Sequence, residues 1–386
     1  MVLLRDIAKL AGVSPSTVSR VINHSAEVAE EKRQRVLEVI KETGFVPNDL
    51  ARAFYNNSAK IIGVIFPDIS NPFFNDVVNA IEKEIYSQGY RMMIFFANDE
   101  TEKLRSVINI LEMLQAEGII LMSNAEDLQE AFKNSTTPVV AFDREAKTNR
   151  EFLYIHSDNR EGGRMATEYM IQCGCKNLLH VRGPQRFSTA RERFKGYCEI
   201  CNMYQIEPKS FEVEYTFEAG KEAGREILKS YPDVDGIIAA NDIVAAAIMR
   251  ELQRSGKKIP DEVQIIGFDD IMLSQILIPE LTTIKQQVNE MGKAAVQAII
   301  DHKDEKEKYG EIIFSVDLVK RESTRQKREN QKSRKTNEDC LSCQDESVCS
   351  KKQTYDRIFS GGGIIHYKYK KDLGFRAGIL GYLYPR

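Results

Sequence analysis

Apolar and polar positions alternate in a regular way through the long middle part of the chain. Short apolar runs of strand length are separated by longer stretches whose apolar residues repeat at helical spacing. The runs are residues 62–66, 92–96, 119–122, 139–142, 178–181, 237–240 and 263–268. Such alternation predicts parallel sheets joined by crossover helices, and the length of this part predicts two doubly wound parallel-sheet subdomains in one α/β domain.

The first sixty residues follow a different, purely helical pattern. Leu4, Ile7 and Ala11 share one helix face, and Gly12 can end that helix in a sharp turn. Ser14 followed by Pro15 is a strong start signal for a second helix. A third helical pattern runs from about residue 30 to residue 43. The pattern predicts an all-α headpiece over residues 1–46, either a helix-turn-helix that binds DNA or a plain packing bundle.

Composition narrows the class of protein. Lys and Arg total 54 against 57 Asp and Glu, so any DNA contact must come from a local basic surface rather than from the whole molecule. No apolar run approaches the roughly 20 residues of a membrane span, and the N-terminus lacks a secretory pattern. Seven cysteines, an odd number, fit a reducing compartment. We therefore expect a cytoplasmic protein without a membrane partner.

Residues 6–23, DIAKLAGVSPSTVSRVIN, resemble the headpiece signature of the lac/gal repressor family. The resemblance implies a helix-turn-helix whose second helix enters the major groove of operator DNA. It implies base contacts from Pro15, Ser16 and Arg20 and phosphate contacts from Thr17 and Asn23. Residues 47–60 resemble the hinge helix and linker of that family, in which Phe54 would be the apolar wedge in the minor groove.

Polar and aromatic residues follow the apolar runs, where ligands of open α/β sheets bind. They are Asn71, Phe73, Phe74, Asp143, Arg144, Arg191, Phe217, Asn241, Asp269 and Gln286. Aromatic faces can stack on a sugar ring, and planar polar groups can bind neighbouring hydroxyls in pairs. Taken singly, each residue has a plainer interpretation as a helix cap, a turn or core packing. Taken together, they predict a site for a small polyhydroxylated ligand.

The same residues occur in the same order in periplasmic ribose-binding proteins and ribose-responsive repressors. The resemblance implies that Phe73, Phe74 and Phe217 enclose the sugar ring and that the seven polar residues bind its hydroxyls. The family resemblance as a whole covers residues 4 to about 325. For the effector-binding and dimerisation domain, residues 61–325, it implies two subdomains joined by crossovers near 157–160, 286–289 and 316–320. It also implies a homodimer on a palindromic operator, released when ribose closes the cleft.

Other functions remain open at this point. A catabolite-type regulator could be gated by a phosphoprotein partner instead of a sugar. A sugar-binding protein or enzyme could carry a fused headpiece, although the residues after the strands include no Ser/His/Asp or metal-ligand grouping that would favour catalysis. Purine-responsive relatives place different groups at several of these positions, so a nucleobase is disfavoured. We expect no enzyme activity and no cofactor.

Residues 326–386 differ in composition from everything before them. The segment starts polar and basic and ends with a glycine run and a Tyr/Lys-rich stretch. Cys340, Cys343, Cys349 and His366 could ligate zinc, but one C-x-x-C without a second pair is weak support for a metal site. We therefore predict a flexible extension without a bound metal, and nothing in it resembles the leucine heptads of a tetramerising tail.

Overall fold

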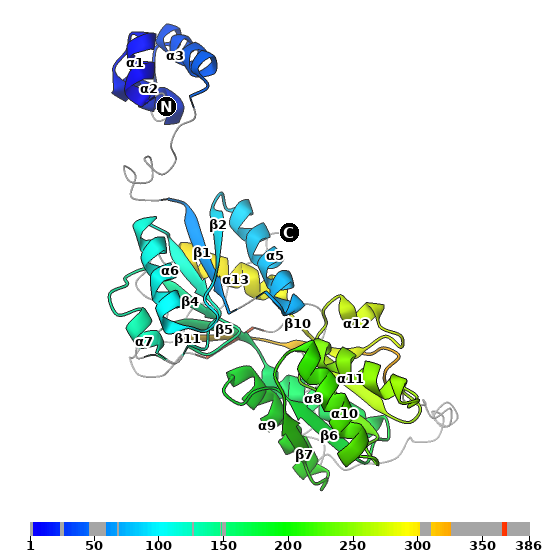
Figure 1. The fold of residues 1–386 in the computed structure, drawn as a ribbon. Coiled ribbons are helices and arrows are strands. Elements are labelled where there is room, and N and C mark those ends of the chain that lie inside the picture. Colours follow the sequence, from blue (N-terminus) through cyan, green and yellow to red (C-terminus); the bar gives the residue numbers. More distant parts are fainter. Residues whose placement is uncertain are drawn as a thin grey trace, which may run out of the picture. The chain divides into compact units, whose positions relative to one another are not determined.

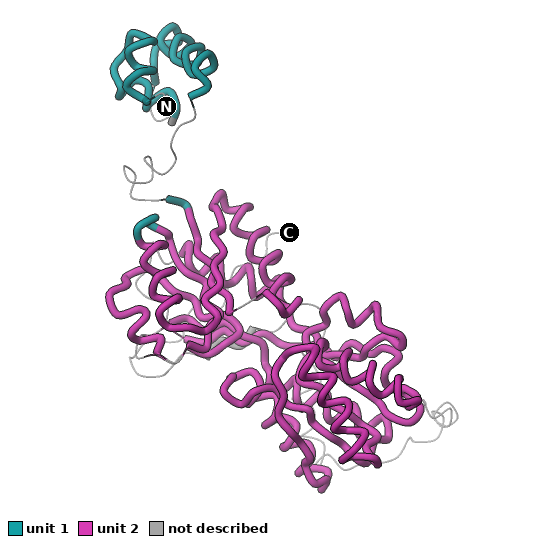
Figure 2. The backbone as a smooth tube through the Cα atoms, in the orientation of Figure 1, with its two compact units in different colours: residues 1–60, 113–115 teal, residues 61–112, 116–386 magenta. Residues whose placement is uncertain are grey.

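The computed structural model describes residues 3–23, 27–45, 59–67, 69–125, 127–146, 148, 152–301, 310–325 and 365–368. The chain divides into two compact units (Figure 2). One unit contains residues 1–60 with 113–115, and the other contains residues 61–112 with 116–386. The hinge segment predicted at 47–60, including Phe54, lies almost entirely outside the described residues.

The first unit is helical, as predicted. It contains α1 (Leu4–Ala11), α2 (Pro15–Asn23) and α3 (Glu30–Thr43). Helix α1 ends at Gly12, whose φ of 64° is readily adopted only by glycine. The three helices share a small buried core that contains Ile7, Val18 and Val36. This core fixes which face of α2 points outward, because Val18 and Val21 are buried.

The second unit contains two mainly parallel sheets, which confirms the predicted fold class (Figure 1). The first sheet has the strand order β13-β11-β5-β4-β3-β1-β2. Its strands are β1 (Ile61–Phe66), β2 (Arg91–Phe96), β3 (Gly118–Leu121), β4 (Val139–Phe142), β5 (Leu153–Ser157), β11 (Gly310–Phe314) and β13 (Ile365–Lys368). Strand β1 pairs in parallel with both β2 and β3, so the strand order reverses beside β1.

Helices bury both faces of this sheet. They are α5 (Pro72–Ser87), α6 (Thr101–Met113), α7 (Leu128–Ala131) and α13 (Val288–Asp301). In β1, Ile62 and Val64 belong to the core beneath α5 and α13, whereas Ile65 belongs to the core beneath α6. Two buried faces explain why the strands are almost continuously apolar in the sequence rather than alternating.

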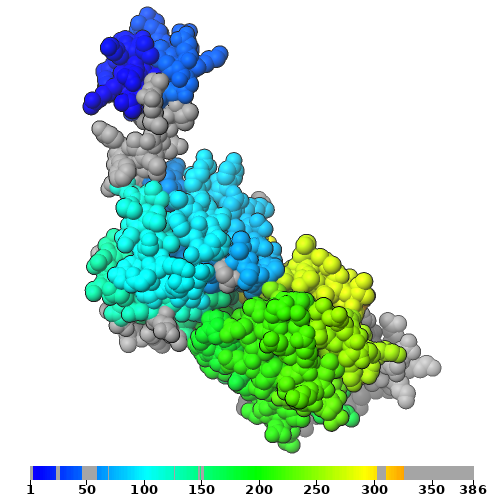
Figure 3. All heavy atoms as spheres, in the orientation of Figure 1, coloured from blue at the N-terminus to red at the C-terminus, as the bar shows by residue number. Residues whose placement is uncertain are grey.

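The second sheet has the order β12-β10-β9-β8-β6-β7 and repeats this plan. Its strands are β6 (Leu178–Arg182), β7 (Lys209–Glu212), β8 (Gly236–Ala239), β9 (Gln264–Asp269), β10 (Thr282–Gln286) and β12 (Val316–Val319). Its helices are α8 (Asn159–Gln172), α9 (Ser188–Met203), α10 (Phe217–Ser230), α11 (Asp242–Arg254) and α12 (Leu273–Ile276). One face packs on α8 and α9 and the other on α10 and α11, which gives the green and yellow lobe of Figure 3.

The chain passes between the two sheets three times. It leaves the first sheet after Ser157 at the end of β5, returns after Gln286 at the end of β10, and leaves again at Ser315 between β11 and β12. The third passage precedes the predicted range 316–320. Each sheet is therefore built from segments that are far apart in the sequence.

Two further findings bear on the predictions. Of the segment 326–386, the structure describes only 365–368, which form β13 antiparallel to β11; Cys340, Cys343 and Cys349 lie outside the described residues. Within the described part of the chain, no helix is both long and apolar enough to cross a membrane.

Candidate functional site

The start of α2 is fixed by the side chain of Ser14. Its Oγ accepts a hydrogen bond from the backbone N–H of Thr17 at 3.2 Å, which caps one of the free amides of the helix. The same oxygen lies 2.8 Å from Ser16 Oγ and 2.9 Å from Thr17 Oγ1. The first turn of α2 therefore carries a connected group of three hydroxyls.

The residues predicted to contact DNA differ in how they are presented. Pro15, Ser16 and Arg20 are exposed, while Thr17 is half-buried beside Ser14. Asn23 is the last residue of α2. An exposed helix start that carries hydroxyls and one arginine can donate to and accept from base edges in a major groove.

The predicted ligand residues of the first sheet follow β1 and β4. Asn71 caps α5, because its Oδ1 accepts from the backbone N–H of Phe73 at 3.0 Å. Phe73 and Phe74 are each 4% exposed, and their ring centroids lie 5.8 Å apart. The Arg144 guanidinium lies 5.5 Å from the centre of the Phe74 ring, so residues after β1 and β4 meet at one edge of the sheet.

Asp143 has a left-handed backbone, with φ of 62°, directly after β4. Its backbone is held by the Tyr154 hydroxyl, which donates to the carbonyl of Asp143 at 3.1 Å. Burial raises the pKa of Asp143, and the charges of Arg144, Arg193 and His156 oppose that rise. Asp143 is thus a buried carboxyl group close to the guanidinium groups of Arg144 and Arg193.

The second sheet contributes a buried network centred on Asp269. Its Oδ1 accepts from Gln286 Nε2 at 2.8 Å and from the Arg193 guanidinium at 3.4 Å. Arg193 also donates to Asn159 Oδ1 at 2.8 Å and to the Ala240 carbonyl at 2.9 Å. The Arg193 guanidinium lies 3.5 Å from the centre of the Phe268 ring. These contacts fix the orientation of the Arg193 and Asp269 side chains.

The pKa of Asp269 reflects these surroundings. Burial raises the pKa of Asp269 to about 7, with a further rise from the carboxylate of Asp143. The charge of Arg193 and the hydrogen bond from Gln286 act in the opposite direction. Asp143 follows β4 and Asp269 ends β9, so the carboxyl group that acts on Asp269 comes from the other sheet.

Three site residues carry buried polar atoms that have no hydrogen-bond partner within the described residues. They are Oδ1 of Asp143, Nδ2 of Asn241 and Oε1 of Gln286. Asn241 uses its other amide atom to cap α11, accepting from the backbone N–H of Val244 at 3.0 Å. An unpaired buried polar atom costs roughly 1–3 kcal/mol unless water or a ligand satisfies it. One donor and two acceptors are therefore ready for a ligand with hydroxyl groups.

Two predicted residues are not brought into this cluster. The Arg191 side chain is 29% exposed and pairs with Glu145 at 3.3 Å, while it also donates to the backbone carbonyls of Gln185 and Arg186. Arg193, not Arg191, reaches the buried carboxyl group. Phe217 is the first residue of α10 and is 40% exposed.

The structure also shows aromatic residues that the sequence analysis missed. Phe187 and Tyr215 stack with ring centroids 5.9 Å apart and an interplanar angle of 9°. Arg144 lies 4.6 Å from the centre of the Phe187 ring, so these rings border the same site as Phe74. Arg193 had a detectable signal, because it lies at helical spacing with Ala190, Tyr197 and Ile200, all buried in α9. Tyr215 lies before α10 and carries no such pattern.

The arrangement is suited to binding a small polar molecule. It combines aromatic rings with two carboxyl groups, two guanidinium groups and three amides, most of them buried. Among the described residues there is no group of three or more His, Cys, Asp or Glu side chains arranged to hold a metal ion.

Comparison with known families divides the chain in the same way as the structure. A model of the bacterial regulatory proteins of the lacI family matches residues 3–48. A second model, of periplasmic binding proteins and the sugar-binding domain of the LacI family, matches residues 59–322.

Curated relatives align over most of the chain. The ribose operon repressor of Halalkalibacterium halodurans is 34% identical over 306 residues, which are 79% of this chain and 92% of that protein. The HTH-type transcriptional repressor PurR of Haemophilus influenzae is 31% identical over 338 residues, or 84% of this chain and 99% of that protein.

Solved structures of LacI family regulators are also similar to this chain. The lac repressor dimer bound to operator and the anti-inducer ONPF has a TM-score of 0.76 at 25% identity and covers 83% of this chain and 98% of its own. A LacI family regulator from Enterococcus faecium with bound ribose has a TM-score of 0.62 at 26% identity and covers 68% of this chain and 98% of its own.

Proposed function

The chain belongs to the lacI family of bacterial regulatory proteins, and on that premise we propose that it is a ribose-responsive repressor. Ribose acts as the inducer, and its binding lowers the affinity for a palindromic operator that a homodimer contacts through two headpieces. That the chain is a sugar-responsive DNA-binding repressor rather than an enzyme follows from the family and from relatives named as transcriptional repressors. The identity of that sugar as ribose is the part that we propose.

One observation carries the choice of a small sugar. Two residues with unpaired buried polar atoms neighbour the network of Arg193, Asp269 and Gln286. The carboxylate of Asp143 acts on the pKa of Asp269, and Asn241 directly follows Ala240, whose carbonyl accepts from Arg193. A pentose presents several hydroxyl groups within a few ångströms, each able to donate and accept. It could satisfy these atoms together while its C–H faces contact the aromatic rings. Two proteins with similar sequence or structure, named for ribose or solved with it, support ribose within this class.

On the DNA side, we assign base contacts to Pro15, Ser16 and Arg20 and phosphate contacts to Thr17 and Asn23. Phe54 is the proposed minor-groove wedge. In the effector site, the seven proposed hydroxyl-binding residues become Asn71, Asp143, Arg144, Arg193, Asn241, Asp269 and Gln286. Arg193 replaces Arg191 because only Arg193 contacts Asp269. The ring-enclosing role is assigned to Phe73 and Phe74, with Phe187 and Tyr215 as additional aromatic neighbours.

The two sites must be coupled in both directions. If ribose lowers operator affinity by some factor, operator must lower ribose affinity by the same factor. Ribose can act only to the extent that it binds the released state more tightly than the operator-bound state.

The direct test measures operator affinity by fluorescence anisotropy with and without D-ribose. The operator is first selected from random DNA by the full-length protein. We expect millimolar D-ribose to weaken operator binding, and L-ribose, a matched sugar of opposite hand, to have no effect. An unchanged affinity with D-ribose would overturn the ligand assignment.

Additional ligands distinguish the alternatives. Hypoxanthine tests a nucleobase effector, which the similarity to PurR makes worth measuring. If hypoxanthine tightens operator binding and D-ribose does not weaken it, the effector is a nucleobase corepressor rather than a sugar inducer. A response to neither ligand, together with capture of a phosphoprotein by the operator-bound repressor, would favour the catabolite-type regulator.

A further inference from the structure

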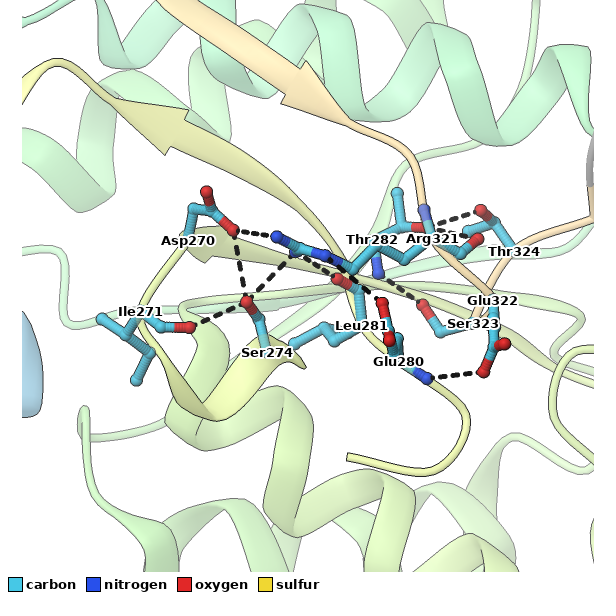
Figure 4. Close-up of polar contacts among 10 residues, drawn as sticks. All are labelled: Asp270, Ile271, Ser274, Glu280, Leu281, Thr282, Arg321, Glu322, Ser323 and Thr324. Atoms are coloured by element: carbon cyan, nitrogen blue, oxygen red, sulfur yellow. Dashed lines mark hydrogen bonds and ion pairs between the residues drawn. The ribbon is translucent and has the colours of Figure 1, made fainter. Parts of the chain in front are cut away.

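Arg321 lies just after β12, beyond the third passage between the sheets, and its side chain is only 11% exposed. Its guanidinium donates to three groups (Figure 4). One nitrogen donates to Asp270 Oδ1 at 2.6 Å, and another donates to Ser274 Oγ at 3.1 Å and to the Leu281 carbonyl at 2.9 Å. The planar fork of an arginine can satisfy such a set of acceptors at once, whereas a lysine ammonium cannot reach them in the same geometry.

The partner of Arg321 lies next to the centre of the proposed sugar site. Asp269 and Asp270 are consecutive, and both have positive φ, of 111° and 57°. Few non-glycine residues adopt such a backbone, and it persists where the surrounding contacts enforce it. The Asp270 side chain is 10% exposed, and besides Arg321 it accepts from Ser274 Oγ at 3.2 Å. Arg321 is the only cation paired with Asp270 within the described residues.

Arg321 also reaches the strand that carries Gln286. Leu281, whose carbonyl accepts from Arg321, immediately precedes β10, and Gln286 ends it. The backbone after β12 is fastened to the same place. The N–H of Arg321 donates to Thr282 Oγ1 at 2.8 Å, and Ser323 Oγ accepts from the N–H of Thr282 at 2.9 Å. Strand β9 ends at Asp269 and strand β10 ends at Gln286. The buried guanidinium of Arg321 therefore contacts residues next to both strands, Asp270 after β9 and Leu281 before β10.

Glu280 offers Arg321 a second carboxylate, but it is a weaker partner. It lies 3.8 Å from Arg321 Nε and is 49% exposed, so water screens this pair. The Asp270 contact is shorter and almost buried. Of these two ion pairs, the one between Arg321 and Asp270 therefore contributes more to holding the turn at Asp269 and Asp270 in place.

We infer that Arg321 is a positioning residue of the effector site. It touches none of the proposed sugar contacts, and it sets the direction of the Asp269 side chain and the register of β10 by holding Asp270, Ser274 and Leu281. This inference deepens the proposed function and rests on it. It gives the segment after the third crossover a role in shaping the sugar site through Asp270, Ser274 and Leu281.

The first experiment needs no sugar. Amide hydrogen exchange is compared in full-length wild type, R321M and R325M. Arg325 is the matched control, because it is exposed and its guanidinium has one long contact, to the Pro260 carbonyl at 3.4 Å. We expect R321M to speed exchange in residues 268–277 by about tenfold or more, with α10 and α11 unchanged. R325M should match wild type. Equal exchange in R321M and R325M would overturn the inference, whatever ligand the protein binds.

The second experiment measures D-ribose affinity by calorimetry below the unfolding transition of every variant. Loss of a buried charge-assisted bond should raise the Kd by about 10- to 100-fold in R321M, with R325M within about twofold of wild type. R321K should recover part of the affinity, because it keeps one charged contact, and it serves as the test variant if R321M does not fold. The double variant D270N/R321M should lose no more D-ribose affinity than the single variants D270N and R321M predict for one lost contact, because both substitutions remove the same contact.

The two hypotheses fail separately. If wild type does not bind D-ribose, the ligand assignment is wrong and hydrogen exchange still decides the role of Arg321. If wild type binds D-ribose and R321M binds it equally well, Arg321 is a structural residue only and the positioning role is wrong.

Discussion

The two proposed recognition surfaces of this chain are made in opposite ways. The residues proposed to contact DNA in the major groove lie within α2, and Pro15, Ser16 and Arg20 are exposed on a helix fixed by a small core and a serine cap. The proposed sugar-binding residues come from segments between Asn71 and Gln286, and most are buried. Arg193 and Gln286 both donate hydrogen bonds to Asp269 within the folded chain.

The difference determines what a mutation does. An exposed side chain on a helix contributes to binding only when DNA is present, so its loss leaves the fold intact. A buried charged side chain has lost its hydration in the folded protein, so its removal leaves partners unpaired and affects both stability and binding. The operator surface should therefore be separable from stability, and the sugar site should not.

The largest effect is expected for Arg193→Met. This change leaves the buried carboxyl group of Asp269 without its cation, and breaking such a pair costs about 3 kcal/mol of unfolding free energy. Urea denaturation measures that loss, and calorimetry should detect no D-ribose binding. Asp269→Asn in the same chain should restore part of the stability, because it removes the unpaired carboxyl group. An unchanged denaturation midpoint in the single variant would show that the pair is not formed in solution.

A smaller effect, confined to DNA, is expected for Arg20→Ala. Loss of an arginine that reads a guanine should lower discrimination between operator and random DNA by about 10- to 100-fold. Anisotropy with both DNAs measures it. D-ribose affinity and thermal stability should stay at the wild-type values, and Arg33→Ala in α3 is the control for loss of one positive charge in the headpiece. Unaltered discrimination would mean that the recognition helix is wrongly assigned.

The pH dependence of sugar binding comes next. Asp269 accepts hydrogen bonds as a carboxylate, and burial raises its pKa to about 7. In the sugar-free fold, this raised pKa contributes stability at low pH that is lost as pH rises through about 7. Hydroxyl donors favour the ionised form, so D-ribose affinity should increase over the same range, by about tenfold or more from about pH 5.5 to about pH 8. Calorimetry in two buffers counts the released proton. Asp269→Asn should bind weakly and lose this pH dependence; a wild-type affinity that falls with pH contradicts the assignment.

The smallest effect is expected at Arg191, which the sequence predicts as a sugar contact but which the structure places outside the cluster around Asp269. Arg191 pairs with Glu145 across partly exposed side chains, and such pairs contribute less than about 1 kcal/mol. Arg191→Ala should therefore weaken D-ribose binding by no more than about fivefold, and Glu145→Gln should do the same. A loss as complete as that of Arg193→Met would restore Arg191 as the sugar contact.

The sequence was sufficient for the architecture, because strand-length apolar runs and helical periodicity are local signals. All seven predicted runs coincide with strands, from β1 to β9. Strands β10 to β13 lie beyond the last predicted run, and strands β5 and β7 were not predicted either. Strand β7, KSFE, lies at the sheet edge and is half polar, and β5 alternates tyrosine and histidine with apolar residues. The signal that identifies a doubly buried strand is absent in both.

The site was harder to predict than the fold. Position after a strand identifies the correct edge of the sheet, but it does not say which face of the next helix points inward. Arg191 and Arg193 are two residues apart in α9, so they lie on nearly opposite faces. Ala190 and Tyr197 mark the buried face of α9, and their helical spacing places Arg193, not Arg191, on that face. Tyr215 and Phe187 belong to loops before helices, where no periodicity indicates which aromatic side chain lies beside Arg144.

The three passages between the sheets also govern the order in which the molecule can be completed during synthesis. Strand β5 (Leu153–Ser157) pairs with β11 (Gly310–Phe314), so the first sheet stays open on that side until almost the entire effector domain has left the ribosome. Such distant pairing slows folding and exposes an unpaired edge to other chains. For the same reason, neither lobe can be expressed as one continuous fragment, and a cut between them separates strands that belong to the same sheet.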